Sequence, residues 1–297
     1  MTERIGFIGL GVMGKPMARN LLARGFSVVV HSRSRGPVDE LVAAGAQAAH
    51  APADVARQSA VVVTMVPDSP DVEAVLEGAD GVFAALAPGS LIIDCSTIAP
   101  AVARRLAARA AELGSAMIDA PVSGGEVGAK SASLSIMIGG DASAVERARP
   151  VLEAMGNRER IVHIGPSGSG QLCKVCNQMV IGGTLAAVSE AFALARKAGV
   201  DPARVRTVLL GGFASSRVLD AHGERILNSN YVPGFRTRLF AKDLGIAVDT
   251  LAEYQTPAPV AAVVQQLVTA LVAAGHADTD YSALATVLFD LAGLDRG

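Results

Sequence analysis

The sequence predicts a two-domain α/β protein in which a doubly wound sheet is followed by an all-helical domain. In the first half, short continuous runs of β-branched and aliphatic residues alternate with helical stretches, a pattern typical of parallel strands that helices bury on both faces. No strand pattern recurs after residue 170. A chain of 297 residues is long enough for two cores. We expect the sheet domain at 1–165 and the helical domain, which begins with a long interdomain helix, at 166–297.

Composition and charge narrow the class of protein. Apolar residues make up 51% of the chain but aromatic residues only 4%, so both cores are expected to consist mainly of Ala, Val and Leu. The net charge is -2 and no basic block occurs, which gives no sign of a nucleic-acid partner. No uninterrupted apolar run is long enough to span a bilayer, and the chain leads from Met1 directly into a strand, without a secretory signal. We therefore expect a cytoplasmic protein without a membrane partner.

The first strand is followed by a glycine pattern in a specific context. An apolar strand at 4–8 leads into the GxGxxG motif at 9–14, which opens a helix at 15–24. Gly25 ends this helix, and a second strand follows at 27–31. This order of elements is typical of a Rossmann-type dinucleotide-binding domain, and a glycine-rich turn without a ligand is the alternative.

Each glycine of the motif has its own role in binding a dinucleotide. Gly9 permits the tight turn, Gly11 lets the backbone approach a pyrophosphate, and Gly14 allows close packing of helix and strand. Val12 and Met13 complete the turn, where free N–H groups at the start of the helix would face the phosphates. The motif therefore predicts cofactor contacts along the whole turn.

The tip of the second strand indicates which dinucleotide binds. An NAD site usually has an acidic residue there, but this chain has Ser32, Arg33 and Ser34, then Arg35, with no acid before Asp39. Guanidinium and hydroxyl groups suit a 2′-phosphate, so NADP(H) is preferred and NAD(H) remains an alternative. A solvated loop with exposed arginines would be compatible with either cofactor.

Further apolar runs, each followed by a polar or glycine-containing tip, are expected to complete the parallel sheet. These runs are 60–66, 91–95, 116–119 and 134–138. Ligands bind at the carboxyl ends of such strands, so Thr97 and the segment Ser123, Gly124 and Gly125 should face the cofactor or substrate. Ser123 and the two glycine amides make a suitable cradle for a carboxylate.

The long helix at 171–198 is expected to organise the second domain. It follows a glycine-rich hinge at 165–170 and would be about 40 Å long. Because it is apolar nearly all round, we expect it to be buried between domains or subunits, in a homodimer or homotetramer. Gly199 ends it, and Asp201 with Pro202 begins the next helix.

One turn of this helix carries polar side chains in an otherwise apolar stretch. Gln171, Lys174 and Asn177 or Gln178 would project from nearly the same side. Burying an ammonium group is expensive, so Lys174 needs a partner or a chemical role unless it extends along its apolar stem to solvent.

The three cysteines are too few for a disulfide framework. Cys173 and Cys176 form a CxxC pair around Lys174, but the five histidines are scattered, so no metal site is expected. A redox pair remains an alternative, as does the use of cysteine as a small core residue.

Motifs spread along the whole chain resemble those of the β-hydroxyacid dehydrogenase family. They are GFIGLGVMGKPMARNL (6–21), DCSTIAP (94–100), DAPVSGG (119–125), GQLCKVCNQ (170–178) and FAKDL (240–244). Within the family, further stretches are most similar to those of tartronate semialdehyde reductases. These are MVPDSP (65–70), GGFASSR (211–217), HGER (222–225), PGFR (233–236) and DYSAL (280–284).

The resemblance implies a role for each matching position. Lys174 would be the catalytic lysine. The matching substrate contacts are Ser123, Gly124, Gly125, Asn177 and Asp243. The matching cofactor contacts are Met65, Val66, Pro67, Thr97 and Lys242. The common KxxNN pattern of the family is KVCNQ here, so Gln178 replaces the second Asn and its reach stays open.

The resemblance also implies a reaction, the reduction of tartronate semialdehyde to glycerate by hydride transfer from NAD(P)H. The substrate carboxylate would rest on Ser123 and the amides of 124–125, with Lys174 as general acid and base. Burial would lower the pKa of this lysine from about 10.4 toward the working pH. Asn177 would hold the lysine and a substrate hydroxyl in register.

Two other functions remain open. The first is a 3-hydroxyisobutyrate dehydrogenase or another dehydrogenase of short β-hydroxyacids, although those relatives tend to carry an acid where this chain has Ser32 and Arg33. The second is a cofactor-binding scaffold without turnover. The joint presence of Lys174, Asn177 and Ser123 argues against a scaffold, because function depends on the site rather than on the fold.

Overall fold

The protein consists of two compact units in a computed structural model that describes residues 3–295. The boundary between the units falls between Lys174 and Val175, inside a long continuous helix, α8 (Ser169–Lys197). We call the part before this boundary the α/β unit and the part after it the helical unit.

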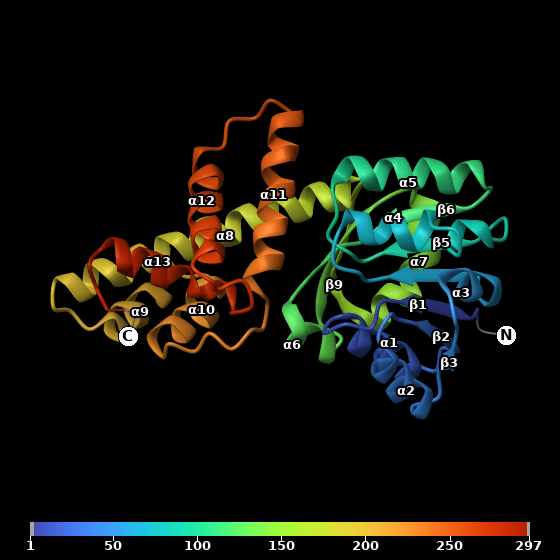
Figure 1. The fold of residues 1–297 in the computed structure, drawn as a ribbon, viewed down its shortest axis with the longest axis horizontal. Coiled ribbons are helices and arrows are strands. Elements are labelled where there is room, and N and C mark those ends of the chain that lie inside the picture. The colour runs from blue at the N-terminus through green and yellow to red at the C-terminus, as the bar shows by residue number, and fades with distance from the viewer. Residues whose placement is uncertain (1–2, 296–297) are drawn as a thin grey trace. The chain divides into compact units, whose positions relative to one another are not determined.

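A mostly parallel sheet forms the centre of the α/β unit (Figure 1). Its strands are β1 (Ile5–Ile8), β2 (Val28–His31), β3 (Gln47–Ala48), β4 (Val61–Thr64), β5 (Leu91–Asp94), β6 (Ala116–Asp119), β7 (Val122–Ser123), β8 (Leu134–Gly139) and β9 (Gly156–Gly165). The strand order is β3-β2-β1-β4-β5-β6-β8-β7, with β9 paired to β8, and β1 to β6 are mutually parallel. The order of these six strands is that of a doubly wound Rossmann sheet, which confirms the predicted fold class.

The far end of the sheet differs from the prediction. We expected 134–138 to be another parallel strand, but β8 runs antiparallel to β6 and β7. Burial along β8 partly alternates, as in a strand with one less covered face. The prediction also missed β9, because its sequence is charged and most of its residues are exposed. β3 and β7 have two residues each, too few to give a recognisable pattern.

Helices cover both faces of the sheet. They are α1 (Gly14–Ala23), α2 (Arg35–Ala43), α3 (Pro52–Gln58), α4 (Ser69–Glu77), α5 (Pro100–Glu112), α6 (Gly125–Lys130) and α7 (Ala142–Met155), with a short 3₁₀ helix η1 (Val82–Ala84). On one face, Phe7 of β1 belongs to a core built with α1, α2 and α7. On the other face, Ile8 belongs to a core built with α3, α4 and α5. Successive residues of one strand thus enter two cores, as continuous apolar runs predict.

The helical unit contains the rest of α8 and the helices after it. These are α9 (Pro202–Leu210), α10 (Arg217–Leu227), α11 (Thr237–Glu253), α12 (Pro259–Ala273) and α13 (Leu284–Leu291), with a 3₁₀ helix η2 (Tyr281–Ala283). Among the described residues of this unit the only β-pairing is an isolated bridge between Arg236 and Asp280. The all-helical prediction is confirmed. The predicted start of α9 is also confirmed, since Asp201 accepts a hydrogen bond from the Ala203 amide, 2.9 Å away.

The middle of α8 packs closely on α11 and α12. A Cβ added to Gly182 would lie 2.9 Å from Val264 Cγ1 and 3.2 Å from Phe240 Cζ, so only glycine fits without displacement. Leu185 and Phe192 are fully buried on the same helix. This face of α8 forms the centre of the core of the helical unit.

The opposite face of α8 is not covered in the single chain. Val180 and Leu194 are 68% and 71% exposed, whereas Val188 is buried in the core. Among residues 3–295, α8 is the one helix long and apolar enough to cross a membrane, and half of its most apolar window is buried inside the protein. The lack of an uninterrupted apolar run therefore did not exclude such a helix. The core helix of a globular protein meets the same criteria.

Candidate active site

The glycine turn after β1 has the geometry that the motif predicts. Gly9 has a φ of +96°, and a side chain there would overlap the carbonyl oxygen of Met65. A side chain on Gly14 would overlap the Gly9 carbonyl, while Gly11 faces open space. Met13 is the N-cap of α1 without a side-chain hydrogen bond, and no acid lies in the first turn. The turn therefore fits a pyrophosphate, which needs backbone amides and close approach.

The tip of β2 lies beside this turn. Ser32 Oγ accepts a hydrogen bond of 3.4 Å from the Leu10 amide, which ties the two segments together. Arg33 is 83% exposed and forms an ion pair of 3.5 Å with Asp71, at the start of α4. The sequence did not reveal this acidic neighbour of Arg33. Ser34 precedes α2 as its N-cap, without a side-chain hydrogen bond.

Buried polar contacts fix the turns after β4 and β5. Asp94 Oδ1 accepts hydrogen bonds from Thr64 Oγ1 at 2.7 Å and from the Ser96 amide at 3.1 Å. Ser96 Oγ in turn accepts one from the Val66 amide at 3.0 Å. The two turns that carry Met65, Val66 and Pro67 on one side and Thr97 on the other are therefore joined to each other.

Two residues with no assigned role anchor the start of α8 to these strand tips. The Gln171 side chain is fully buried; it donates to the Ser96 carbonyl at 2.8 Å and accepts from the Ile98 amide at 3.2 Å. The Asp119 carboxylate accepts from the amides of Gly168 and Gln171, at 2.7 and 2.8 Å. Burial raises the pKa of Asp119 to about 6, although the amide hydrogen bonds lower it.

Lys174 occupies the next turn of α8. It is only 7% exposed, and its Nζ donates a hydrogen bond of 3.0 Å to the Val122 carbonyl oxygen. Ser123 follows Val122 directly, and Gly124 and Gly125 have positive φ angles of 136° and 61°. The alternative of a lysine that extends to solvent is therefore wrong. The structure brings the ammonium group to the strand tip predicted to hold a carboxylate.

A chain of polar contacts joins the predicted site residues of the helical unit. Asn177 Nδ2 donates to Gln178 Oε1 at 2.7 Å, and Gln178 Nε2 donates to Asp243 Oδ2 at 2.6 Å. Lys242 Nζ forms an ion pair with Asp243 Oδ1 at 2.9 Å. Gln178 and Asp243 are 4% and 3% exposed. Gln178, whose reach the sequence left open, thus contacts both Asn177 and Asp243.

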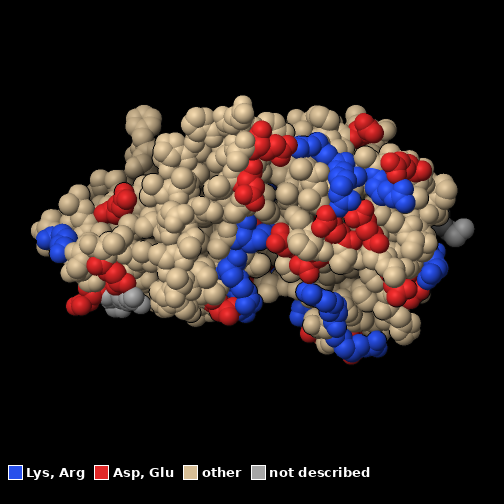
Figure 2. Space-filling model, turned by 45° about the horizontal axis from the view of Figure 1, so that its top comes forward, with Lys and Arg blue, Asp and Glu red and all other residues tan. Residues whose placement is uncertain are grey.

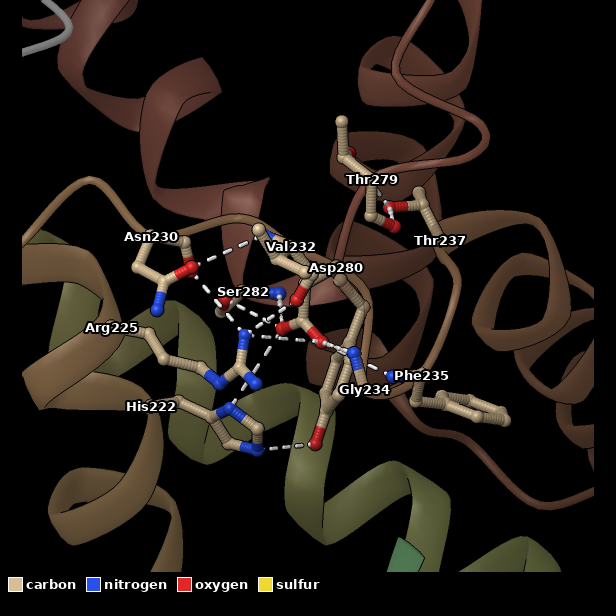
Figure 3. A network of polar contacts seen from close by, with 11 residues as sticks. His222, Arg225, Asn230, Val232, Gly234, Phe235, Thr237, Thr279, Asp280 and Ser282 are labelled. Atoms are coloured by element: carbon tan, nitrogen blue, oxygen red, sulfur yellow. Dashed lines mark hydrogen bonds and ion pairs between the residues drawn. The ribbon is translucent and has the colours of Figure 1, made fainter. Parts of the chain in front are cut away.

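A buried carboxylate, Asp280, supports the segment before α11 (Figure 3). It accepts hydrogen bonds from the amides of Gly234 and Phe235, at 2.9 and 3.1 Å, and from the Ser282 hydroxyl at 2.6 Å. Arg225 lies 3.8 Å from its Oδ2. The stretches 222–225, 233–236 and 280–284, which the sequence offered only as points of resemblance, meet in this one network.

The same network contains His222 and Tyr281. Burial lowers the pKa of His222 and raises that of Tyr281. A hydrogen bond of 2.6 Å joins His222 Nε2 and Tyr281 Oη, and the Tyr281 ring packs against Phe240 of α11. The contacts of this network lie around the start of α11, the helix that carries Lys242 and Asp243.

The predicted site residues fall into two groups, one in each unit. The group of the α/β unit contains the glycine turn, the tips of β2, β4, β5 and β7, and Lys174. The group of the helical unit contains Asn177, Lys242 and Asp243. Sequence reasoning gave no role to Asp94, Asp119, Gln171 or Gln178, although all of them lie in the motifs that carried the resemblance. No group of three or more potential metal ligands occurs in the part of the chain that the structure describes.

Comparison with known proteins places this geometry in a family. The model of the NAD-binding domain of 6-phosphogluconate dehydrogenase matches residues 4–165. The model of the NAD-binding domain of NADP-dependent 3-hydroxyisobutyrate dehydrogenase matches residues 168–288. The 2-hydroxy-3-oxopropionate reductase of Escherichia coli is 44% identical over 96% of this chain and 97% of its own length. The chain belongs to the β-hydroxyacid dehydrogenase family.

Other relatives carry names that refer to other hydroxyacid substrates. The NAD-dependent L-serine dehydrogenase of Pseudomonas aeruginosa is 39% identical over 97% of this chain and 98% of its own. The solved structure of Mycobacterium tuberculosis 3-hydroxyisobutyrate dehydrogenase with L-serine is 37% identical, with a TM-score of 0.88 over 97% of this chain and 99% of that chain. This β-hydroxyacid dehydrogenase is therefore an oxidoreductase with an NAD(P)-binding domain.

Proposed function

We propose that this β-hydroxyacid dehydrogenase reduces tartronate semialdehyde (2-hydroxy-3-oxopropanoate) to glycerate. One observation carries the proposal: the buried ammonium of Lys174 lies against the Val122 carbonyl, directly before the Ser123–Gly125 cradle. This arrangement suits a small carboxylate with a carbonyl group next to the lysine. The identity of 44% to the Escherichia coli reductase, against 39% to the L-serine dehydrogenase, supports this substrate.

NADPH is the proposed reductant, and NADH is the alternative. The glycine turn from Gly9 to Gly14 would hold the pyrophosphate, and Arg33 would bind a 2′-phosphate from the tip of β2. The turns at 65–67 and Thr97, together with Lys242, would supply further contacts. When bound, the reduced nicotinamide supplies the hydride.

The residues of this chain would then position the substrate and move one proton. The Ser123 hydroxyl and the amides of Gly124 and Gly125 would bind the carboxylate, because each donates a hydrogen bond. As the aldehyde is reduced, Lys174 Nζ would donate a proton to the carbonyl oxygen, which would become the primary hydroxyl of glycerate. Asn177 and Asp243 would bind the single 2-hydroxyl of the substrate and keep it in register.

We also propose that the protein assembles through its helical unit. Charged side chains are sparse on the face of this unit that Figure 2 shows. Its exposed large apolar side chains are Val180, Leu194, Val200, Val208, Phe213, Val232, Tyr254, Val260, Val263 and Leu291. Apolar side chains that gather on a face with few charges favour association, here as a homodimer or a homotetramer.

A substrate panel tests the proposed reaction. Tartronate, methylmalonate and succinate semialdehydes would be assayed with NADH and NADPH, with L-serine and 3-hydroxyisobutyrate in the oxidative direction. We expect the highest kcat/KM for tartronate semialdehyde with NADPH. A higher kcat/KM for methylmalonate semialdehyde or 3-hydroxyisobutyrate would instead identify a 3-hydroxyisobutyrate dehydrogenase. If no compound is turned over, the remaining function is the cofactor-binding scaffold without catalytic activity.

A further inference from the structure

We infer that Gln178 is a positioning residue. Asp243 fixes the direction of the Gln178 amide, and Gln178 in turn fixes the direction of the Asn177 amide. This inference rests on the proposed function. An amide side chain can present either its oxygen or its nitrogen to a neighbour. A carboxylate can only accept hydrogen bonds. The contact of 2.6 Å between Gln178 and Asp243 Oδ2 therefore requires the amide nitrogen of Gln178 to face Asp243.

The orientation of Gln178 fixes that of Asn177. With its nitrogen on Asp243, Gln178 has its Oε1 available for Asn177, which donates from Nδ2 at 2.7 Å. One N–H of Asn177 is thereby committed, and its Oδ1 is held at the other end of the amide. Asn177 thus presents an acceptor in a fixed direction, as recognition of a substrate hydroxyl requires.

Lys242 binds Asp243 at the end of this series of polar contacts. Its Nζ lies 2.9 Å from Asp243 Oδ1, so the carboxylate has a cation on one oxygen and the Gln178 amide on the other. Both Gln178 and Asp243 are nearly inaccessible to water, which strengthens the preference for one orientation. Alanine in place of Gln178 would remove the amide donor from Asp243 Oδ2 and the acceptor that orients Asn177.

Kinetics of three variants test the positioning role. Gln178→Ala and the shorter Gln178→Asn should lower kcat/KM for the substrate by about tenfold to hundredfold, the usual effect of losing a charge-assisted hydrogen bond. The KM for the substrate should rise while the KM for NAD(P)H stays unchanged. In Gln178→Glu, a protonated carboxyl can reproduce both contacts of the amide, since its hydroxyl donates and its carbonyl accepts. An ionised carboxylate at position 178 would instead repel the carboxylate of Asp243.

The pH dependence of Gln178→Glu separates positioning from a general effect on folding. Its kcat/KM relative to the wild type should rise by about tenfold as the pH falls from 8 to 5.5, because two adjacent carboxyls share a proton more tightly than one carboxyl alone. Gln266→Glu makes the same change at an exposed position of α12 and should show no such recovery. If Gln178→Ala keeps the wild-type KM and a kcat within about twofold, Gln178 does not position the substrate.

A measurement without turnover tests the contact itself. The Tm of Gln178→Glu, relative to the wild type, should fall as the pH rises from 5.5 to 8. Adding Asp243→Asn should abolish this dependence, because the amide introduced at position 243 can donate to the new carboxylate. An unchanged dependence in the double variant would overturn the inference. If the wild type reduces none of the semialdehydes, the proposed function fails, and the Tm comparison still decides whether Gln178 and Asp243 are coupled.

Discussion

At the scale of single residues, Lys174 occupies a place that its charge alone would disfavour. Its ammonium group is withdrawn from water and hydrogen-bonded to a backbone carbonyl beside two glycines with positive φ angles. A lysine in this position would keep a proton close to a bound carbonyl group. Burial and neighbourhood together make it the best candidate for the proton donor.

Replacing Lys174 tests this assignment. Lys174→Ala should lower kcat by about 10²–10⁴, the usual contribution of a positioned general acid, and leave NAD(P)H binding nearly unchanged. Steady-state kinetics and fluorescence titration of the cofactor would measure the two effects. Lys197→Ala, at the exposed last turn of the same helix, is the control. Turnover within about tenfold of the wild type would exclude Lys174 as the acid.

Arg33 tests the choice of cofactor. Its ion pair with Asp71 is exposed, and such pairs contribute little, so the guanidinium can turn to a 2′-phosphate. Arg33→Ala should raise the Kd of NADPH by about tenfold to hundredfold and hardly change that of NADH. Arg57→Ala, in another exposed ion pair on α3, should change neither. Equal losses for both cofactors would mean that Arg33 does not recognise the phosphate.

At the scale of elements, the helices α8 and α11 carry Lys174, Asn177, Lys242 and Asp243, and each is held at its start. The start of α8 is anchored by Asp119 and Gln171 on the strand tips. The start of α11 is held by the Asp280 network and by the Thr237 amide, which donates to the Thr279 carbonyl at 2.9 Å. Polar anchors suit this purpose because a hydrogen bond fixes direction, which apolar packing does less well.

The Asp119 anchor should make stability depend on pH. The pKa of Asp119 is about 6 in the folded protein and 3.8 ordinarily, so the folded state binds this proton more tightly. Its contribution to the free energy of unfolding is therefore greatest below about pH 4 and falls as the pH rises toward 6, by on the order of 3 kcal/mol.

Comparison with Asp119→Asn isolates this effect. The free energy of unfolding of the wild type minus that of the variant should decrease between pH 4 and 6 and then level off. Urea unfolding across that range measures it. Asp141→Asn removes an exposed carboxyl and serves as the control. A difference that stays constant, or grows with pH, would contradict the raised pKa.

At the scale of the whole molecule, apolar surface is unevenly distributed. Most of the large apolar side chains that are exposed lie in the helical unit. Some of them lie on the face of α8 that points away from the core of that unit. A Cβ added to the half-buried Gly183 of α8 would lie 3.3 Å from Cγ1 of the exposed Val260 of α12, so the two helices are close at this point. A second copy of the chain would remove this surface from water.

Val180 is the residue that tests assembly. It is 68% exposed in the single chain, so Val180→Asp should not disturb the core but would bury an unpaired carboxylate in an interface. Light scattering at micromolar concentration should show smaller species than the wild type. Val188 is unsuitable because it is a core residue, and Val162→Asp on β9 is the exposed control. A wild type that is already monomeric would refute the proposed assembly.

Local patterns determined much of this protein. The glycine turn, the first six strands apart from the short β3, and the capped start of α9 follow from residues close in the chain. Lys174 could be singled out because a charge in an apolar helix has few explanations. These features depend on local backbone preferences and on which faces must be buried, and both are visible in sequence patterns.

Only the tertiary structure decided the contacts between distant segments. Gln178 meets Asp243 across 65 positions and Gln171 meets Ser96 across 75, and no periodicity indicates which polar group pairs with which. The sequence likewise did not predict the antiparallel direction of β8 or the exposed face of α8. It also did not predict that three motifs meet around Asp280. A hydrogen bond between distant residues depends on how whole elements pack, because packing sets the distance and direction on which the bond depends.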